Sequence, residues 1–220
     1  MDKDKSLIYD ADAMRFTEVP RSEADPDRII ETEPDVTGCD SPKKTMEDMH
    51  RVDVSGFRSQ KKMPVAVVLD NIRSLNNIGS IFRTCDGFDC SMIYLCGITA
   101  TPPSPQIHKT ALGAEESVEW TYCPTTAEAV SRLKEQGYRI MCLEQCFGSV
   151  PLQDFVPCEG ERYALVVGNE VDGVDPAIVN ACDTYIEIPM SGTKHSLNVA
   201  VATAVTLWEF YKHSDVLGKV

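Results

Sequence analysis

The stretch from Pro64 to Cys96, PVAVVLDNIRSLNNIGSIFRTCDGFDCSMIYLC, contains a complete strand–helix–strand pattern. Residues 64–69 form a short apolar, β-branched run between a proline and a polar pair, which is typical of a strand buried on both faces of a parallel sheet. Apolar residues at helical spacing then predict a helix over 77–87, and residues 91–96 predict a second strand. Strand, helix and strand within about 30 residues make a βαβ unit. This stretch therefore predicts a parallel α/β fold.

The rest of the chain continues the alternation of strands and helices. Further strands are predicted at 138–143, 163–167 and 185–188, and further helices at 125–136, at 176–181 and from Ser196 onward. Residues 97–113 contain three prolines, so we expect a long surface loop there. Residues 199–208 are apolar nearly all round, which predicts a buried helix. Together these elements describe an open, mostly parallel α/β sheet.

The 220 residues are enough for one domain of ordinary size plus an appendage, and their formal net charge is -13. Such a charge disfavours nonspecific adhesion to nucleic acid or to an anionic membrane, so a nucleic-acid partner would need a local basic face. Residues 1–44 hold 12 Asp and Glu against 7 Lys and Arg, a local charge of -5, and predict a flexible acidic extension. Residues 64–220 are the expected folded domain.

The segment between these parts, residues 45–63, has helical spacing in its first half and the most basic local run of the chain. It gathers Arg51, Arg58, Lys61 and Lys62. Two interpretations are open for this basic helical arm: it is a solvated linker, or it contacts phosphates.

The nine cysteines form no CxxC pair and no Cys/His set at zinc-finger spacing, so we expect reduced, mainly buried thiols and no metal. No apolar run reaches the roughly 18 residues that span a bilayer. The N-terminus MDKDKSLIYD lacks the apolar core of a signal peptide. These features predict no membrane partner and a cytoplasmic location.

Ligands of open α/β sheets bind beyond the carboxyl ends of the strands, so the residues after each strand are site candidates. After the strand at 64–69 come Asn77 and Arg83, which we expect on roughly the same side of one helix. Gly79 lies between them and allows another group to approach the backbone closely. After the strand at 163–167, two glycines frame a turn around Glu170. After the last strand, a polar loop leads into the C-terminal helix.

Each of these loops also has a purely structural explanation. Asn and Gly are common turn residues, and Glu170 is favourable near a helix N-terminus. Arg83 is equally compatible with a surface ion pair. Ser196 or Asn198 can simply cap the last helix. The residues alone therefore indicate an α/β domain that binds a small ligand.

Taken in order and spacing, the three loops resemble the signature motifs of the SpoU/TrmH class of SPOUT methyltransferases. The first motif is Asn77-x-Gly79-x-x-x-Arg83 and the second is Gly168-Asn169-Glu170-x-x-Gly173. The third is Ile188-Pro189-Met190-x-Gly192-x-x-x-Ser196-Leu197-Asn198-Val199. The resemblance covers about residues 65–210.

The resemblance implies a Rossmann-like sheet with a C-terminal deep trefoil knot, and a homodimer. It also implies methyl transfer from S-adenosylmethionine to a ribose 2'-hydroxyl of tRNA or rRNA. The positions that it makes catalytic are Arg83, Asn77, Glu170, Ser196 and Asn198. Those that it assigns to the cofactor are Gly168, Ile188 and Leu197.

Arg83 matches the position to which activation of the 2'-hydroxyl is usually assigned in this class. A guanidinium stays protonated, so proton abstraction is a poor role for it. We expect Arg83 to stabilise the developing alkoxide and to hold the adjacent phosphate. Ser196 and Asn198 would position the cofactor or the ribose, and Glu170 would orient Arg83 or its own loop.

The acidic charge departs from the basic extensions or added RNA-binding domains that are common in this class. RNA capture must then depend on a partner protein or on a local surface. The candidates for that surface are Arg51, Arg58, Lys61, Lys62, Arg73, His108, Lys109 and Lys194.

Two rival functions remain open to test. The first is a catalytically inactive, knotted RNA-binding or assembly protein. It is disfavoured by the presence of Arg83, Glu170, Ser196 and Asn198. The second is a nucleotide-binding oxidoreductase, which is disfavoured because no GxGxxG follows the first strand.

Overall fold

The structure, a computed structural model, describes residues 52–216 and the backbone of residues 5–10, 15–20 and 29–30. The chain forms two compact units, residues 1–49 and 50–220. In the first unit, β1 (Lys5–Asp10) pairs antiparallel with β2 (Arg15–Pro20) and with β3 (Ile29–Ile30). No strand is predicted here from the sequence. The flexible character of residues 1–44 stays a prediction.

The second unit contains a seven-stranded parallel sheet with the order β6-β5-β4-β9-β7-β10-β8. Its strands are β4 (Met63–Asp70), β5 (Cys90–Cys96), β6 (Trp120–Cys123), β7 (Tyr138–Leu143), β8 (Val150–Pro151), β9 (Arg162–Val167) and β10 (Thr184–Glu187). The predicted parallel α/β sheet is therefore confirmed. The expected strands all form, and β6 and β8 are additional.

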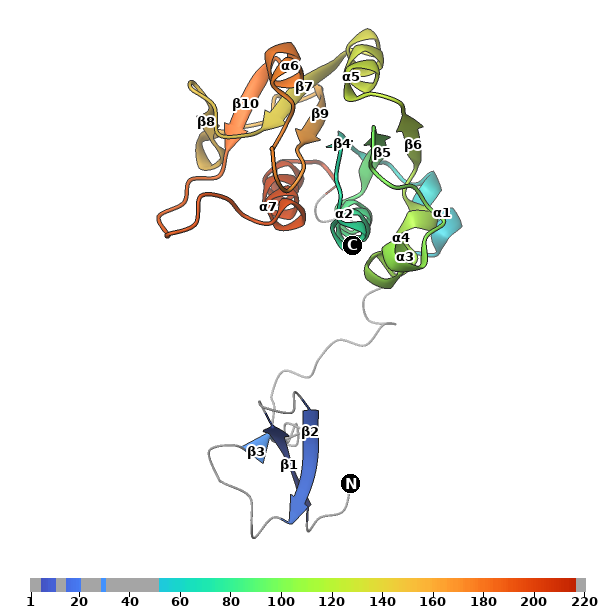
Figure 1. Cartoon of the computed structure of the whole chain (residues 1–220). Helices are drawn as coiled ribbons and strands as arrows, with labels where there is room; N and C mark the ends of the chain where they lie inside the picture. The colour runs from blue at the N-terminus through green and yellow to red at the C-terminus, as the bar shows by residue number, and fades with distance from the viewer. Residues whose placement is uncertain (1–4, 11–14, 21–28, 31–51, 217–220) are drawn as a thin grey trace. The chain divides into compact units, whose positions relative to one another are not determined.

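Helices cover both faces of this sheet (Figure 1). One face carries α2 (Leu75–Gly87), α3 (Pro105–Ala111) and α7 (Val199–Lys212), together with the short α1 (Val54–Ser59) and α4 (Ala114–Ser117). The other face carries α5 (Thr126–Glu135) and α6 (Pro176–Ala181). A short 3-10 turn, Leu152–Asp154, follows β8, and its Leu152 belongs to the core on the α7 face. Two hydrophobic cores result, one on each side of the sheet.

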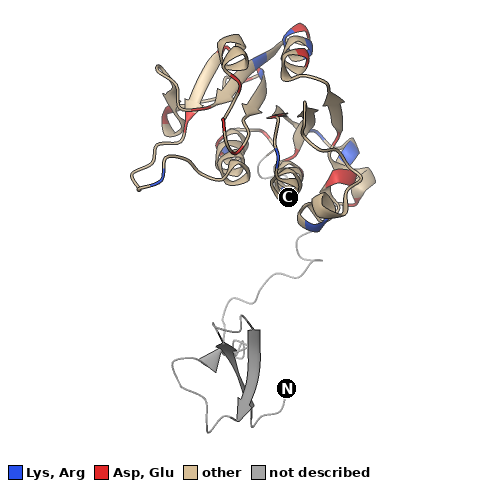
Figure 2. Cartoon of the chain, in the orientation of Figure 1, with Lys and Arg blue, Asp and Glu red and all other residues tan. Residues whose placement is uncertain are grey.

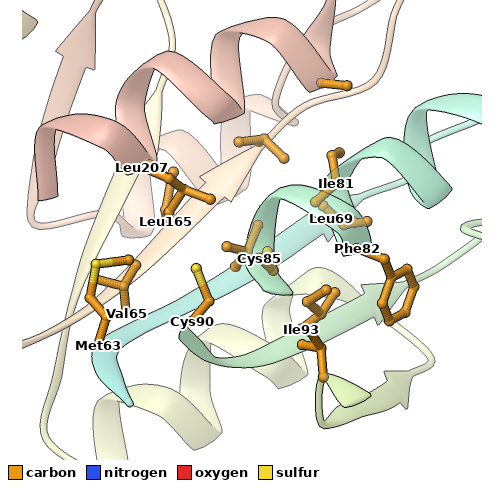
Figure 3. Packing of buried hydrophobic residues seen from close by; sticks show 14 of the residues in the cluster. Met63, Val65, Leu69, Ile81, Phe82, Cys85, Cys90, Ile93, Leu165 and Leu207 are labelled. Atoms are coloured by element: carbon orange, nitrogen blue, oxygen red, sulfur yellow. The ribbon is translucent and has the colours of Figure 1, made fainter. Parts of the chain in front are cut away.

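The central strand β4 shows why its sequence is continuously apolar. Val65 and Leu69 belong to the core under α2, whereas Ala66 and Val68 belong to the core under α5. Figure 3 shows the first of these cores, in which the β4 side chains lie near those of α2. A strand covered on both faces has no solvent-facing positions, so the alternation of apolar and polar residues disappears.

Residues 97–113, predicted as a long loop, contain the helix α3, so that prediction is wrong. Pro105 is in the first turn of α3, where a missing N–H costs nothing because no helical partner exists for it. The Ser104 hydroxyl accepts a hydrogen bond from the Ile107 N–H at 3.5 Å and caps the helix. The prolines mark the start of a helix here, not its absence.

The helix α7 is not buried all round, contrary to the prediction. Leu207 and Phe210 are buried against the sheet, but Val201, Val205 and Trp208 are 50%, 40% and 50% exposed. These three residues, here called the α7 stripe, follow at intervals of four and three and so lie along one side of the helix. Their exposure makes the α7 stripe a candidate interaction surface.

Gly79 is where α2 and α3 pack most closely. A Cβ atom at this position would lie 2.1 Å from the Thr110 hydroxyl oxygen and 2.3 Å from the Ile107 carbonyl oxygen. The backbone approach expected at Gly79 is therefore confirmed, and the approaching group is the neighbouring helix.

We predict that Gly79→Ala destabilises the fold by about 1–3 kcal/mol, because the added methyl group pushes α3 away from α2. Gly87→Ala is the matched control, since Gly87 ends the same helix and its Cβ atom would meet nothing within 4 Å. Urea unfolding of both variants measures the difference. A Gly79→Ala protein as stable as the Gly87→Ala protein would contradict this account of the packing.

The eight cysteines among the described residues are all free, and Cys85, Cys90, Cys96, Cys123 and Cys142 are buried. Cys39 lies outside the described residues. Burial raises the pKa of Cys96 to about 12, which keeps this thiol protonated. No helix in the described part of the chain is long and apolar enough to cross a membrane. Within residues 52–216, no three His, Cys, Asp or Glu side chains are grouped as metal ligands.

Candidate active site

The loops that follow β7, β9 and β10 line a cleft of about 670 Å³ at the carboxyl edge of the sheet. Because the strands are parallel, their carboxyl ends meet at one edge, as the sequence predicted. The three predicted cofactor positions, Gly168, Ile188 and Leu197, all line this cleft. Glu170, Ser196 and Asn198 line it as well. The volume is typical of a small-molecule site.

Two glycines shape the turn between residues 168 and 173. The Asn169 N–H donates to the Gly173 carbonyl at 3.0 Å, and the Gly173 N–H donates back to the Asn169 carbonyl at 3.1 Å. A Cβ atom on Gly168 would lie 2.0 Å from the Gly173 carbonyl carbon. Gly173 itself has a φ of 71°, which disfavours other residues. The turn therefore needs glycine at both ends.

Glu170, inside this turn, joins the second loop to the first. Its carboxylate accepts hydrogen bonds from the Arg73 N–H at 3.1 Å, the Ser74 N–H at 3.0 Å and the Asn77 side-chain amide at 2.8 Å. Partial burial raises the pKa of Glu170, but the hydrogen bonds from Asn77 and the backbone outweigh it, so the pKa is lowered overall. Glu170 is thus an ionised cap on the N-terminal end of α2.

Asn77 and Asn198 join the third loop to the other two. The Asn198 amide donates to the Asn77 side-chain oxygen at 3.0 Å. The Asn198 oxygen accepts from the Ala200 N–H at 2.9 Å and so caps α7. A continuous chain of hydrogen bonds runs from Glu170 through Asn77 to Asn198. The structure brings these three predicted residues together, while their catalytic roles stay predictions.

Glu144, which follows β7 directly, is a cleft residue that the sequence reasoning missed. Its carboxylate accepts from the Val174 N–H at 3.1 Å and from the Gln145 N–H at 2.9 Å. The Gln145 amide in turn donates to the His195 carbonyl at 2.8 Å. Glu144 directly follows a predicted strand, and residues in that position are site candidates in an open α/β sheet. Its position in the sequence could therefore have identified it.

The cleft has a strongly acidic lining. Four carboxylates line it, from Glu144, Glu170, Asp172 and Glu187, and no Lys, Arg or His among the described residues does so. Apolar side chains such as Ile188 and Leu197 complete the wall. A ligand with an apolar or aromatic part and a positive charge suits this lining.

Arg83 does not line the cleft. It is exposed and lines a separate hollow with Lys109 and Thr84. The expectation that Asn77 and Arg83 share one side of the helix is wrong, because six residues at about 100° each leave them about 120° apart. Asn77 accordingly points toward Glu170, and Arg83 points away from it.

Five of the eight predicted RNA-contacting residues have a carboxylate of the same chain as a neighbour. Arg58, Lys61, Lys62, Arg73 and His108 each lie beside a carboxylate. Figure 2 shows Lys and Arg side by side with Asp and Glu on the helices. Lys109 and Lys194 form no ion pair with the described residues, and Arg51 lies outside them. The structure describes residues 52–63 of the predicted arm, in which Val54–Ser59 form α1, and residues 45–51 lie outside the described part.

Comparison with known sequences gives a family match over most of this unit. Residues 64–208 match the sequence profile of the SpoU rRNA Methylase family. An uncharacterized tRNA/rRNA methyltransferase of Synechocystis is 31% identical over 163 residues, which are 70% of this chain and 40% of that relative. This chain covers 65% of another relative of the TrmH family. The chain therefore spans less than two thirds of the length of these curated relatives.

Solved structures show the same fold. An rRNA methyltransferase from Sinorhizobium meliloti, bound to AdoMet, has a TM-score of 0.65 and 26% identity, over 71% of this chain and 60% of that chain. The TrmH/SpoU tRNA modifying enzyme of A. aeolicus has a TM-score of 0.64 and 28% identity, over 73% of this chain and 81% of that chain.

Proposed function

The chain belongs to the SpoU rRNA methylase family, and from this premise we propose that it transfers a methyl group from S-adenosylmethionine to a ribose 2'-hydroxyl of structured RNA. The observation that carries the proposal is the chain of hydrogen bonds that joins the three motif loops, Glu170 to Asn77 to Asn198, at the cleft. The substrate class, tRNA or rRNA, follows the names of the relatives.

The cleft residues fit S-adenosylmethionine. Its sulfonium and ammonium groups are cations, and the cleft offers carboxylates from Glu144, Glu170, Asp172 and Glu187. Ile188 and Leu197 offer apolar contacts for the adenine ring. When bound, the cofactor supplies an activated methyl group. The AdoMet complex of the Sinorhizobium meliloti relative supports this assignment.

We extend the proposal to a homodimer formed through the α7 stripe. Val201, Val205 and Trp208 are exposed apolar residues that a second copy would bury. Ala204, between the first two, lines the hollow that contains Arg83. A second copy on this face therefore meets Arg83. We propose that each active site combines the cleft of one copy with Arg83 of the other, since Arg83 lies outside its own cleft.

In this arrangement the residues of the chain orient the reactants and stabilise charge. Arg83, always protonated, stabilises the alkoxide that develops on the ribose oxygen. Asn198 and Ser196 hold the ribose or cofactor in line for attack. Glu170 fixes Asn77 and the loop in which it lies, and so acts as a positioning residue.

We also propose that the last part of the chain forms a trefoil knot. β10 pairs with β7, whereas α7 packs beside α2 on one face of the sheet. The segment 188–198 connects β10 to α7 and passes the loop that follows β7, where the Gln145 side-chain amide donates a hydrogen bond to the His195 carbonyl. This return path supports a knot. The free cysteines similarly support a cytoplasmic location.

Calorimetry with S-adenosylmethionine tests the cofactor site. We expect the wild-type chain to bind it, and Leu197→Arg to weaken binding by about tenfold or more, because a guanidinium then occupies the cleft beside the cation. Val156→Arg is the control, since Val156 is an exposed apolar residue outside the cleft. No binding by the folded wild-type chain would favour the inactive RNA-binding or assembly protein instead.

A further inference from the structure

The hollow beside Arg83 is a second concave site, distinct from the cofactor cleft. It lies between α2, α3 and α7 and encloses about 550 Å³. Arg83 comes from α2 and Lys109 from α3, and hydroxyls come from Ser80, Thr84 and Thr110. No Asp or Glu among the described residues lines it. The two sites therefore have opposite charge, the cleft acidic and this cationic hollow basic.

The free cations of this acidic domain are concentrated here. Residues 52–216 contain twelve Lys and Arg, of which eight form ion pairs with carboxylates of the same unit. Arg162 instead contacts the Gln136 carbonyl and the Tyr138 ring. Three cations have no such partner among the described residues, and two of them, Arg83 and Lys109, share the cationic hollow. Their charge is available to an outside anion.

One of the three hydroxyl groups in the hollow has a proton that it can donate to an anion. The Thr84 hydroxyl donates to the Ser80 carbonyl at 2.9 Å, and the Thr110 hydroxyl donates to the Asn76 carbonyl at 3.1 Å. The Ser80 hydroxyl forms no hydrogen bond with a described residue, so its proton can be donated to a ligand. A planar guanidinium, an ammonium and a hydroxyl together match the oxygens of a phosphate group.

We propose that the cationic hollow binds a phosphodiester of the RNA backbone and that Lys109 is a substrate-positioning residue there. This inference rests on the proposed function, because Arg83 is the residue expected to act at the target ribose. A phosphate held by Lys109 and Arg83 fixes the RNA backbone next to that ribose. The Arg83 guanidinium then reaches both the phosphate and the ribose oxygen. The domain then captures RNA with a small local site despite its negative charge.

The salt dependence of RNA binding tests this proposal with the full chain. The probe is unfractionated tRNA, and its affinity is measured by fluorescence anisotropy over a range of salt concentrations. We expect Lys109→Gln to weaken binding by about three- to tenfold and to reduce the slope of log K against log salt by about one. Lys109→Arg keeps the charge and should keep the slope. Lys134→Gln, on α5, is the control for the loss of one charge elsewhere.

Several outcomes would overturn the proposal. Equal slopes for Lys109→Gln and Lys134→Gln would show that the hollow holds no backbone phosphate. Calorimetric binding of inorganic phosphate that requires Lys109, together with an unchanged RNA slope, would assign the hollow to free phosphate. Neither readout uses S-adenosylmethionine. Loss of cofactor binding would therefore refute the proposed methyl transfer, whereas unchanged slopes with intact methyl transfer would refute only the role of Lys109.

Discussion

Replacing Arg83 by alanine lowers the rate of methyl transfer by about 10²- to 10³-fold, the loss typical when a preorganised charge is removed from a developing oxyanion. The affinity for S-adenosylmethionine stays unchanged, because Arg83 lies outside the cofactor cleft. The rate is measured as transfer of labelled methyl groups to RNA at saturating cofactor, and the affinity by calorimetry.

Two further variants separate the role of Arg83 from a general loss of charge. Arg132→Ala removes an exposed arginine from α5 and should leave the rate unchanged. Arg83→Lys keeps the charge but loses the planar fork, so it should restore only part of the rate. An Arg83→Ala protein as active as the wild type would remove Arg83 from the reaction.

Mixing two impaired variants restores activity if each site is shared between two copies, when the cofactor concentration is too low to fill the cleft of Leu197→Arg. Arg83→Ala keeps an intact cleft, and Leu197→Arg keeps an intact Arg83. In a mixed dimer, the cleft of the first meets Arg83 of the second, which completes one of the two sites. Random exchange makes half of the dimers mixed, so about a quarter of wild-type activity should return. Methyl transfer before and after mixing and subunit exchange measures this recovery.

A substitution in the α7 stripe is the control for the mixing experiment. Adding Trp208→Glu to both variants places a charge in the proposed interface and should prevent the recovery. Mixed dimers, verified by different tags, that remain inactive would show that Arg83 acts within its own chain. In that case the hydrogen-bonded end of α2 would have to move for Arg83 to reach the cleft.

Much of the fold could be predicted because local pattern and tertiary structure agree. The run at 64–69 is apolar at every position, and only a strand covered on both faces satisfies it. Once the strands are parallel, the loops after β4, β9 and β10 must share an edge. The meeting of Glu170 with Asn77 follows from this topology, although no local pattern identifies the hydrogen-bond partners.

Other features depend on contacts that no local pattern contains. Pro105 predicts a break in regular structure, and only the capping hydrogen bond to Ser104 shows that it begins the helix α3. The apolar composition of α7 predicts burial, but the sequence does not distinguish burial in its own core from burial against a second copy. The opposite directions of Asn77 and Arg83 follow from helix geometry and could have been calculated.

The ion pairs of the basic residues could not be predicted from local sequence either. Arg58, Lys61 and Lys62 form a run in the sequence, yet each meets a carboxylate from a distant segment: Glu119, Asp215 and Asp89. In the sequence, Lys109 has no other Lys or Arg nearby, and the fold brings it to Arg83. The charge available to RNA is thus set by the tertiary structure.

The central claim is methyl transfer to a ribose 2'-hydroxyl of RNA. Its most direct test maps 2'-O-methylated nucleotides in the RNA of cells with and without this protein, and then treats the deficient RNA with the purified chain and S-adenosylmethionine. We predict that at least one 2'-O-methyl site is lost without the protein and regained on treatment. Identical maps, or a methyl group regained on a base in place of a ribose, would contradict the proposal.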